Sequence, residues 1–415
     1  MKSEFCLIGP ITQLVSLSGL PERGPVKDEE IQPLAQAGLL LKGNKIYKTG
    51  VYQELKKQAE AVGAALVELD QDYVCLPGFV DAHTHICFGG SRANDYAMRN
   101  SGKTYLEISE AGGGIWDTVQ QTRKASAHEL EVLTLARASR HLSEGVTTIE
   151  VKSGYGLSTQ EELKMLRVIQ AVNSQTPADL VATCLAAHTL PRDISGNHAA
   201  YLQEMAAQLL PVILEEKLSR RVDAFVEKGA FSAEDISPYF KKAQEMGFDI
   251  TVHADQFSSA GSAVAVAFGA LSADHLEAST QQDIDRLAQS KVIAVALPGA
   301  SIGLGCGFTP ARKMLDAGLS LAIASDWNPG SAPMGDLLAQ AAILGTFEKL
   351  SNAEVLSGIT FRAAQALNLH DRGKLEEGFL ADFVLFAAKD YKEILYQQGK
   401  LKPAKVFKGG VLFKG

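Results

Sequence analysis

The sequence predicts an α/β protein, a closed (β/α)8 barrel of the TIM type with a small β-sandwich domain built from both chain termini. In the middle of the chain, short apolar runs alternate with amphipathic stretches of helical period, which is typical of βα units in a parallel sheet. Both ends of the chain instead contain short apolar runs separated by turns. At 415 residues, the chain has room for one barrel and one small further domain.

The two ends of the chain predict strands that pair with each other. The Gly43-Asn44 pair separates two strand-like runs within residues 38–50, and this is the turn chemistry of a β-hairpin. Residues 383–386 and 406–413 repeat the pattern near the other end. We therefore expect both termini to contribute to one small domain, with the larger domain inserted between them.

The middle of the chain contains eight candidate strands, and we expect residues 76–371 to form the barrel, with residues 1–75 and 372–415 forming the composite domain. The strands are residues 78–83, 146–151, 180–188, 222–227, 249–253, 270–275, 292–297 and 319–326. Between them fall amphipathic segments predicted as helices, at residues 126–143, 159–173 and 233–246. Eight βα units of this kind favour a closed barrel.

An open doubly wound sheet is the competing architecture, and it predicts a glycine-rich phosphate turn after the first strand. No GxGxxG or Walker sequence stands there. The densest glycine cluster, residues 112–114, follows helix-like sequence instead. We interpret it as a flexible loop beside a pocket.

The charge balance favours a small-molecule substrate. The net charge of −8 argues against nucleic acid or an anionic membrane, because either surface needs clustered Lys and Arg. No secretion signal is recognisable, and no apolar run reaches the roughly 18 residues that span a bilayer. The cysteines form no CxxC pair, which favours the reducing cytoplasm; they are Cys6, Cys75, Cys87, Cys184 and Cys306.

Candidate catalytic side chains end the predicted strands, on the face where barrel enzymes build their active sites. The residues in question are His83, His188, His253, His275 and Asp326. His85 lies two residues after His83, and on a strand two such side chains project to the same face. An isolated His-x-His is more often a solvated or core pair, but here it is matched by His253 and Asp326 on later strands.

Three histidines and one carboxylate are typical ligands for one divalent metal ion, zinc or ferrous iron. We expect His83, His85, His253 and Asp326 to hold it. Such an ion activates water and polarises a carbonyl, so metal-dependent hydrolysis is the predicted reaction class. Asp326 can act as both ligand and general base.

Two further polar residues keep open interpretations. His275 is either a second metal ligand or a group that orients the attacking water, with a buried structural histidine as the alternative. Lys152 follows the second strand, where a metal-bridging carbamate is conceivable but a simple ion pair is favoured. The other histidines fall on helical or exposed sequence and are interpreted as structural: His128, His141, His198 and His370.

Substrate contacts are expected from the loops beyond the strand ends. Arg92 follows the ligand pair closely, and its planar guanidinium is suited to clamp a carboxylate, with a surface salt bridge as the alternative. Tyr155 stands in a glycine-flanked turn that exposes its hydroxyl. Asn328 and Ser331 lie in a rigid polar loop after the last strand.

These residues stand in runs that resemble the imidazolonepropionase family of histidine degradation, within the amidohydrolase superfamily. The likeness extends over most of the chain, and the Gly-Gly-Ser-Arg, Lys-Ser-Gly-Tyr-Gly-Leu and Asn-Pro-Gly runs are the most particular to the family. The runs that carry it are residues 77–85, 88–92, 112–115, 151–157, 253–256, 272–276 and 325–331, with residues 373–382 resembling the superfamily's return into its small β domain.

The resemblance implies a one-metal enzyme that opens the ring of 4-imidazolone-5-propanoate with water, giving N-formimidoyl-L-glutamate. It assigns the metal to His83, His85, His253 and Asp326, and makes His275 a histidine that assists the reacting water. His188 then belongs to the catalytic site as well. The substrate-binding positions that it implies are Arg92, Tyr155, His188, Gln256, Asn328, Gly330 and Ser331.

The chain departs from the family pattern in two places. Gln256 stands where some members have Glu and others Gln. Residues 297–306 lack the usual aromatic segment, so we expect a roomier pocket wall there. Another cyclic amidase or a deaminase of the superfamily therefore remains the alternative function, and a catalytically silent barrel is a third hypothesis. A homodimer through an apolar face of the barrel helices is also compatible with the sequence.

Overall fold

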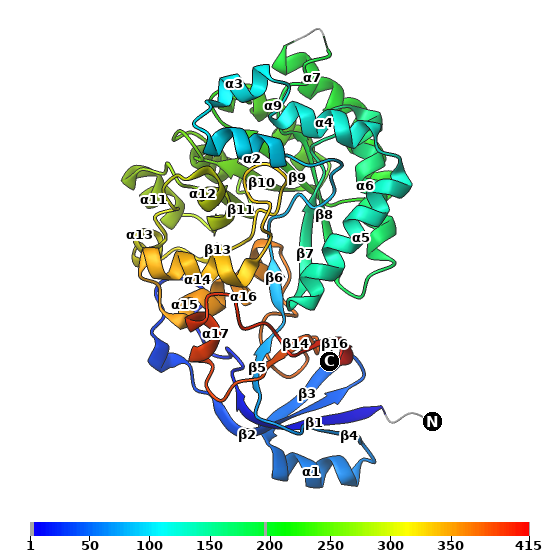
Figure 1. Cartoon of the computed structure of the whole chain (residues 1–415), viewed down its shortest axis with the longest axis vertical. Coiled ribbons are helices and arrows are strands. Elements are labelled where there is room, and N and C mark those ends of the chain that lie inside the picture. The colour runs from blue at the N-terminus through cyan, green and yellow to red at the C-terminus, as the bar shows by residue number, and fades with distance from the viewer. Residues whose placement is uncertain (1–3, 195–196, 415) are drawn as a thin grey trace.

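The computed structural model describes residues 4–194 and 197–414. Its larger part is a barrel of parallel strands, drawn in the upper half of Figure 1. All eight predicted strands are confirmed, and each pairs in parallel with the next along the chain. They are β6 (Phe79–Asp81), β7 (Val146–Lys152), β8 (Asp179–Ala187), β9 (Arg221–Val226), β10 (Asp249–Ala254), β11 (Ser272–His275), β12 (Ile293–Ala296) and β13 (Leu321–Ile323).

The barrel closes between its first and last strands, just beyond their carboxyl ends. Thr84 and Trp327 form a parallel bridge there. The backbone N–H of His85 donates to the carbonyl of Trp327 at 2.9 Å, and the N–H of Asp326 donates to the carbonyl of His83 at 3.0 Å. The residues that close the ring of strands are therefore the predicted metal ligands or their direct neighbours.

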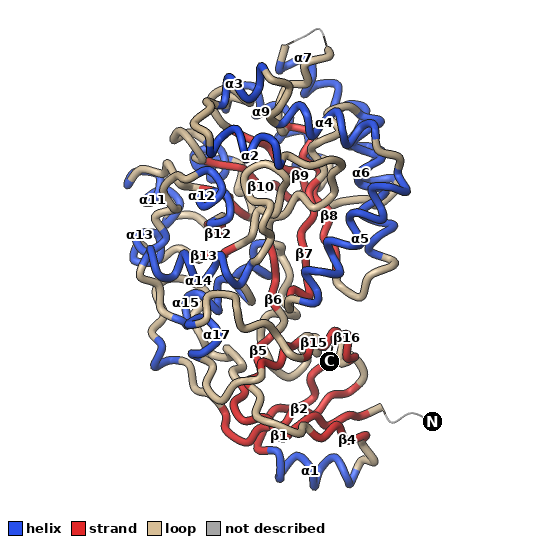
Figure 2. Tube along the Cα trace, viewed as in Figure 1, coloured by secondary structure: helices blue, strands red, loops and turns tan. Residues whose placement is uncertain are grey.

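Helices cover the outside of the barrel, as Figure 2 shows in blue around the red strands. The three helices predicted from the sequence are α5 (Ala127–Ser143), α6 (Thr159–Asn173) and α9 (Ala233–Glu245). Ser126 explains where α5 begins, because its hydroxyl accepts from the N–H of Glu129 while the Glu129 carboxylate accepts from the N–H of Ser126. Ser232 and Asp235 form the same capping box at α9.

The other helices of the barrel lie in its loops and its outer layer. Before the second strand come α2 (Ala93–Asn100), α3 (Tyr105–Glu110) and α4 (Ile115–Lys124). Later come α7 (His198–Glu204), the π-helical turn η2 (Met205–Leu209), α8 (Leu210–Glu215), α10 (Gly261–Ala267), α11 (Gln281–Ala288), α12 (Pro298–Leu304), α13 (Ala311–Asp316), α14 (Leu337–Glu348), α15 (Asn352–Gly358), α16 (Phe361–Ala366) and α17 (Lys392–Tyr396). Among the described residues, no helix combines the length and apolar character needed to cross a membrane.

The two termini meet in one mixed sheet below the barrel (Figure 1). Its strands are β1 (Phe5–Leu14), β2 (Leu34–Lys42), β3 (Lys45–Val51), β4 (Ala65–Glu68), β5 (Val74–Pro77), β14 (Phe383–Phe386), β15 (Lys405–Lys408) and β16 (Val411–Lys414). The predicted hairpin is the antiparallel pair β2 and β3. The termini join where β5 pairs antiparallel with β14.

This sheet buries apolar side chains on both faces. On one face, Tyr52 and Leu55 of α1 (Tyr52–Ala61) pack against Leu7 and Leu40. The other face forms a second core, which includes Ile8, Leu39, Phe383 and Phe407. A short 3-10 turn, η1 (Asp28–Glu30), follows β1. The domain boundaries after residue 75 and before residue 372 stay predictions.

Ion pairs join the small sheet to the base of the barrel. Lys408 of β15 lies 2.7 Å from Asp179, the first residue of β8, and 2.6 Å from Asp382. Arg372 also donates to Asp179 and to the hydroxyl of Thr148 on β7. These ion pairs hold the small sheet against the base of the barrel, so the opposite face of the barrel is left for the site.

Candidate metal centre

The predicted ligand pair lies just beyond β6 with both imidazoles buried. His83 has no exposed surface and His85 is 3% exposed. The residue between them is held from β7, because the N–H of Thr84 donates to the Glu150 carboxylate at 3.1 Å and the Thr84 hydroxyl donates to the Glu150 carbonyl at 2.6 Å. This anchoring fixes the backbone from which both histidines project.

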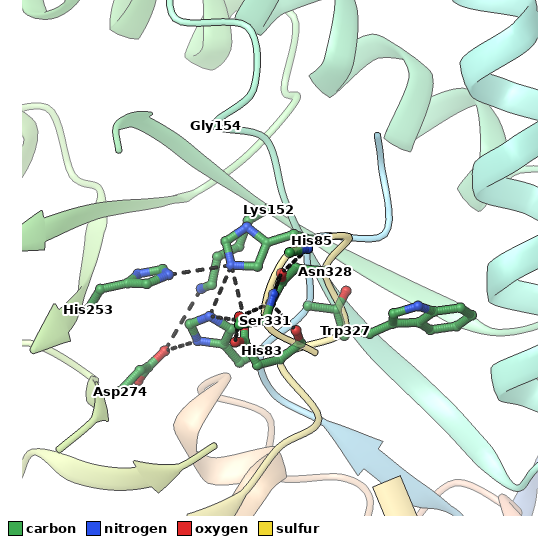
Figure 3. Close-up of polar contacts among 12 residues, drawn as sticks. His83, His85, Lys152, Gly154, His253, Asp274, Trp327, Asn328 and Ser331 are labelled. Atoms are coloured by element: carbon green, nitrogen blue, oxygen red, sulfur yellow. Dashed lines mark hydrogen bonds and ion pairs between the residues drawn. The ribbon is translucent and has the colours of Figure 1, made fainter. Parts of the chain in front are cut away.

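Three of the predicted ligands converge on one point. Candidate ligand atoms of His83, His85 and His253 all lie within 4.8 Å of one another. Nε2 of His85 is 3.2 Å from Nε2 of His83 and 3.4 Å from Nε2 of His253. Oδ1 of Asp326 lies 3.5 Å and 3.4 Å from the Nε2 atoms of His83 and His85. Figure 3 shows His83, His85 and His253 gathered in this way.

The spacing of these atoms fits a metal ion. Zinc holds nitrogen and oxygen ligands at about 2.0 to 2.2 Å, and two tetrahedral ligands at about 2.05 Å lie about 3.3 Å apart. The measured separations of 3.2 to 3.5 Å agree with that value. Nitrogen atoms that face each other this closely need a shared proton or a cation between them. The three imidazoles therefore have the chemistry and the spacing of a metal site, and Oδ1 of Asp326 lies next to two of them.

The protonation of the histidines also suits metal binding. Burial lowers the pKa of His83 and His85 well below the usual value, with the nearby Lys152 charge acting in the same direction. Burial lowers the pKa of His253 to about 3, even though Asp223 opposes the shift. All three imidazoles are then neutral at pH 7, so each keeps a nitrogen lone pair for a metal.

Carboxylates behind two of the histidines orient them. Nδ1 of His83 lies 2.6 Å from Oδ2 of Asp274, and Nδ1 of His253 lies 3.0 Å from Oδ2 of Asp223. A proton on Nδ1 that faces a carboxylate leaves Nε2 as the metal-binding atom. Neither Asp223 nor Asp274 was predicted as a site residue. The available signal was the charge itself, because Asp223 interrupts the apolar run of β9 and Asp274 directly precedes His275 in β11.

Lys152 and a third carboxylate, that of Glu150, lie next to Asp223 and Asp274. Lys152 forms ion pairs at 2.8 Å with Glu150 and Asp223, and Asp274 lies 3.9 Å away. The favoured interpretation of Lys152 as an ion-pair residue is therefore confirmed. Burial raises the pKa of Asp274, whereas Asp223 has its pKa held well below the usual value by His253 and Lys152 despite burial.

His275 lies beside the cluster rather than at its centre. Its ring centroid is 5.4 Å from that of His253 and 5.8 Å from that of His83. Burial works against its protonation, but Nδ1 lies 3.4 Å from the Glu277 carboxylate, and Glu277 with Asp326 and Asp274 raises its pKa. Its backbone has φ of +85°, and the Thr309 hydroxyl donates to its carbonyl. The loop therefore presents an imidazole with raised basicity to the cluster.

Tyr155 and His188 form the wall next to His85. The ring of Tyr155 lies 5.8 Å from His85 and 5.6 Å from His188. Nδ1 of His188 contacts the carbonyl of Gly154 at 2.9 Å. Beneath this turn, the buried carboxylate of Glu162 accepts three backbone N–H groups, those of Gly154, Gly156 and Leu157. Glu162 was not predicted, and it holds the turn that presents Tyr155.

The loop after β13 forms a polar rim on the other side. The Asn328 side chain accepts the N–H groups of Gly330 and Ser331 and donates to the carbonyl of Asp326. The Ser331 hydroxyl lies 3.4 Å from Oδ2 of Asp326. The rim is thereby connected directly to a predicted metal ligand.

Arg92 reaches this same rim from the loop after His85. Its Nη1 would lie 2.5 Å from a Cβ placed on Gly330, so the glycine makes room for the guanidinium. Its Nε donates to Asp95 at 2.7 Å, and the same carboxylate oxygen accepts the N–H of Gly114. The predicted glycine cluster thus helps to hold the partner of Arg92. Asp95 is buried and Arg92 is half-buried, so this pairing is less exposed than the surface salt bridge considered as the alternative.

The segment that lacks the expected aromatic residues packs more tightly at its glycines than the sequence suggests. On α12, a Cβ on Gly303 would lie 1.6 Å from the carbonyl oxygen of Ser331, and a Cβ on Gly299 would lie 2.4 Å from that of Ser325. Arg99 donates to the Gly303 carbonyl at 2.7 Å. At these two positions the backbone of the β13 loop occupies the space that small residues leave.

The remaining predicted residues lie around this centre or away from it. Gln256 stands three residues after His253 in the loop that follows β10 and is half-buried. His141 is buried beneath the site, where its Nε2 lies 2.9 Å from Asp81. His198 pairs with Asp235, and His128 and His370 are exposed. These four histidines stand apart from the metal cluster, as predicted.

Comparison with known proteins shows the family of the chain. The amidohydrolase family model matches residues 74–413. The imidazolonepropionase of Bdellovibrio bacteriovorus is 40% identical over 97% of this chain and 95% of its own length. The chain belongs to the imidazolonepropionase family of amidohydrolases. Imidazolonepropionases of Bacillus cytotoxicus and Symbiobacterium thermophilum are 39% and 37% identical, over 98% and 99% of this chain and 96% and 98% of their own lengths.

Solved structures of more distant proteins share the fold of this imidazolonepropionase family member. A zinc complex of atrazine chlorohydrolase from Arthrobacter aurescens superposes with a TM-score of 0.72 at 16% identity, covering 99% of this chain and 95% of the other. An adenosine deaminase from Xanthomonas campestris with bound zinc has a TM-score of 0.71 at 18% identity, covering 99% and 92%. At such identities the likeness shows the fold alone.

Proposed function

We propose that the chain hydrolyses the ring amide of 4-imidazolone-5-propanoate to N-formimidoyl-L-glutamate in L-histidine degradation. A single zinc or ferrous ion is held by His83, His85, His253 and Asp326 in this proposal. The observation that carries it is the convergence of three neutral imidazoles, with the half-buried Arg92 next to Gly330 at the rim of the site. Family membership supports the choice of substrate.

The proposed reaction forms one bond to the ring carbonyl carbon and breaks its bond to nitrogen. When bound, the ion lowers the pKa of a water molecule and polarises the carbonyl. Oδ1 of Asp326 faces the imidazoles, which leaves Oδ2 to accept a proton from the attacking water and pass it to the leaving ring nitrogen. His275 assists the water, because its raised basicity favours a proton on its imidazole.

The proposed substrate has a propanoate side chain, and Arg92 is the group that would bind its carboxylate. A guanidinium binds a carboxylate through two parallel N–H groups. Its Nε is oriented by Asp95, so an Nη edge remains directed toward Gly330. The other proposed substrate contacts are Tyr155, His188, Gln256, Asn328, Gly330 and Ser331.

The decisive test follows the loss of imidazolone absorbance with purified protein of known metal content, together with identification of the product. We expect turnover that is lost on chelation and recovered with zinc or ferrous ion, at about one ion per chain. His83→Ala should abolish it, whereas His370→Ala, an exposed histidine, should not. Absence of turnover by metal-loaded protein would contradict the proposal. Ammonia release, or turnover only of other lactams or hydantoins, would favour another amidohydrolase activity.

We also propose that the protein is cytoplasmic, that it binds neither nucleic acid nor membranes, and that it forms a homodimer. All five cysteines are unpaired within the described residues, which fits a reducing compartment. Cell fractionation tests the location, and sedimentation equilibrium of the purified protein tests the dimer.

A further inference from the structure

A buried layer of charge lies inside the barrel beneath the metal ligands. Glu150 and Lys152 belong to β7, Asp223 to β9 and Asp274 to β11, which are alternate strands of the barrel. Inward-facing residues from alternate strands form one layer of a barrel's interior, and this layer is usually apolar. Here each of the four side chains is at most 1% exposed.

Lys152 is the cation at the centre of this layer. Its Nζ lies 2.8 Å from Oε1 of Glu150, 2.8 Å from Oδ2 of Asp223 and 3.9 Å from Oδ2 of Asp274. Figure 3 shows Lys152 between the imidazoles and Asp274. Buried carboxylates without a counter-charge are strongly unfavourable, so the ammonium stabilises all three in their present places.

Each carboxylate in turn contacts a segment that carries a metal ligand. Oδ2 of Asp274 faces Nδ1 of His83, and Oδ2 of Asp223 faces Nδ1 of His253. Asp223 also accepts the backbone N–H of His253 through Oδ1. Glu150 accepts the N–H of Thr84, the residue between His83 and His85. One ammonium group is therefore connected to His83 and to His253 through one carboxylate each, and to His85 through Glu150 and the backbone of Thr84.

We propose that Lys152 is a positioning residue for the metal: it holds Glu150, Asp223 and Asp274 where they orient the three histidine ligands. The backbone of Lys152 contributes as well, because its N–H donates to the Thr84 carbonyl at 2.9 Å. This inference rests on the proposed metal site and deepens it. Lys152 is neither a proposed metal ligand nor a proposed substrate contact, so its effect reaches the site through the carboxylates that it pairs with.

The test compares zinc affinity and the visible absorption of the cobalt-substituted protein in Lys152→Met and Lys408→Met. Lys408 is the matched control, because it too bridges two carboxylates, Asp179 and Asp382, but at the base of the barrel. Loss of an outer-shell partner typically weakens metal binding about 10-fold to 100-fold. We expect that loss and an altered cobalt spectrum in Lys152→Met alone. Wild-type affinity and spectrum in a folded Lys152→Met would overturn the inference.

A double-mutant cycle separates positioning from a general loss of stability. Zinc affinity is measured for Lys152→Met, for Asp223→Asn and for the double variant that carries both changes. The double variant leaves fewer carboxylates unpaired, so it can be used if Lys152→Met alone does not fold. We expect Lys152→Met to weaken zinc binding less in the Asp223→Asn background, because the two residues act through one contact. Additive effects would overturn the inference, as would a double variant that binds zinc as tightly as the wild type. Failure of the wild type itself to bind a metal would instead contradict the proposed function.

Discussion

Oδ2 of Asp274 lies 2.6 Å from Nδ1 of His83, and this contact decides which nitrogen of the imidazole is free for a metal. The carboxylate favours a proton on Nδ1, so the lone pair of Nε2 faces His85 and Asp326. Nδ1 of His253 likewise lies 3.0 Å from Oδ2 of Asp223, at the distance of an ion pair. The imidazole nitrogen atoms that would bind the metal are therefore oriented before an ion is bound.

Asp274→Asn should weaken zinc binding about 10-fold to 100-fold, because an amide no longer specifies the Nδ1–H tautomer of His83. Isothermal titration or competition with a chromogenic chelator measures this. Asp235→Asn is the matched control. Asp235 also pairs with a histidine, because its Oδ2 lies 3.0 Å from Nδ1 of His198, and this pair stands apart from the metal ligands. Equal affinities of the two variants would contradict the role assigned to Asp274.

Arg92→Lys should raise KM ten-fold or more and change kcat less, because a lysine cannot form two parallel bonds to the substrate carboxylate. Steady-state kinetics with the imidazolone substrate tests this split. Arg167→Lys serves as control, because Arg167 also pairs with a carboxylate, that of Glu216, but on the exposed helix surface. A fall in kcat at unchanged KM would contradict a binding role.

Gly330→Ala should act through Arg92, because the new methyl group would lie 2.5 Å from its Nη1. We expect a rise in KM in the same direction as for Arg92→Lys, with little change in metal content. The matched control is Gly307→Ala, where no heavy atom lies within 4 Å of the added carbon among the described residues. Wild-type kinetics for Gly330→Ala would show that the arginine is placed elsewhere in solution.

Glu162→Gln should lower kcat/KM without loss of metal. A Gln side chain can keep the two N–H groups that one oxygen of Glu162 accepts, those of Gly156 and Leu157, but its amide nitrogen then faces the N–H of Gly154. The turn that carries Tyr155 should loosen as a result. Kinetics and metal analysis on the same sample test this, and lost zinc would assign Glu162 to the metal instead.

Acid should destabilise the metal-free protein through its buried histidines. The unfolded chain protonates His253 near its usual pKa of about 6.5, whereas the folded chain does so only at about 3. Stability is therefore lost as the pH falls from about 6.5 toward 3. His83 and His85 contribute with the same sign, whereas the raised pKa values of His275 and of the buried carboxyl groups of Asp274, Glu150 and Asp326 oppose them.

The measurement is Tm against pH for the metal-free protein. His253→Gln should show a shallower decline below pH 6.5 than the wild type, because one contribution is removed. His370→Gln, which changes an exposed side chain, should follow the wild type. A steeper decline in His253→Gln would reverse the sign worked out above.

The strands and main helices could be predicted because each has a local signal. Short, mostly apolar runs marked the eight barrel strands, and amphipathic segments of helical period marked α5, α6 and α9. The strand-end histidines followed from the same pattern, since the carboxyl ends of barrel strands share one face. Local sequence was therefore sufficient for the frame and for the proposed metal ligands.

The charged layer could not be predicted because it depends on contacts between strands distant in sequence. Glu150 and Asp223 are 73 positions apart by their numbering and meet only through Lys152. In sequence, a buried charge on a strand looks the same as an exposed one. The expectation of a roomier wall at residues 297–306 stays a prediction: the backbone of Ser331 takes the space at Gly303, whereas no described heavy atom lies within 4 Å of a Cβ placed on Gly305.

The ring of strands closes at Thr84 and Trp327, and the proposed ligands stand on both sides of that closure. His83 and His85 belong to the first βα unit made during synthesis, and Asp326 belongs to the last. An ion held by all of them would connect the first and last strands of the barrel across this closure. A chain released before its final unit would have three imidazoles but no carboxylate to complete the set. Tight occupancy of the metal would then report that the whole barrel has been made and closed.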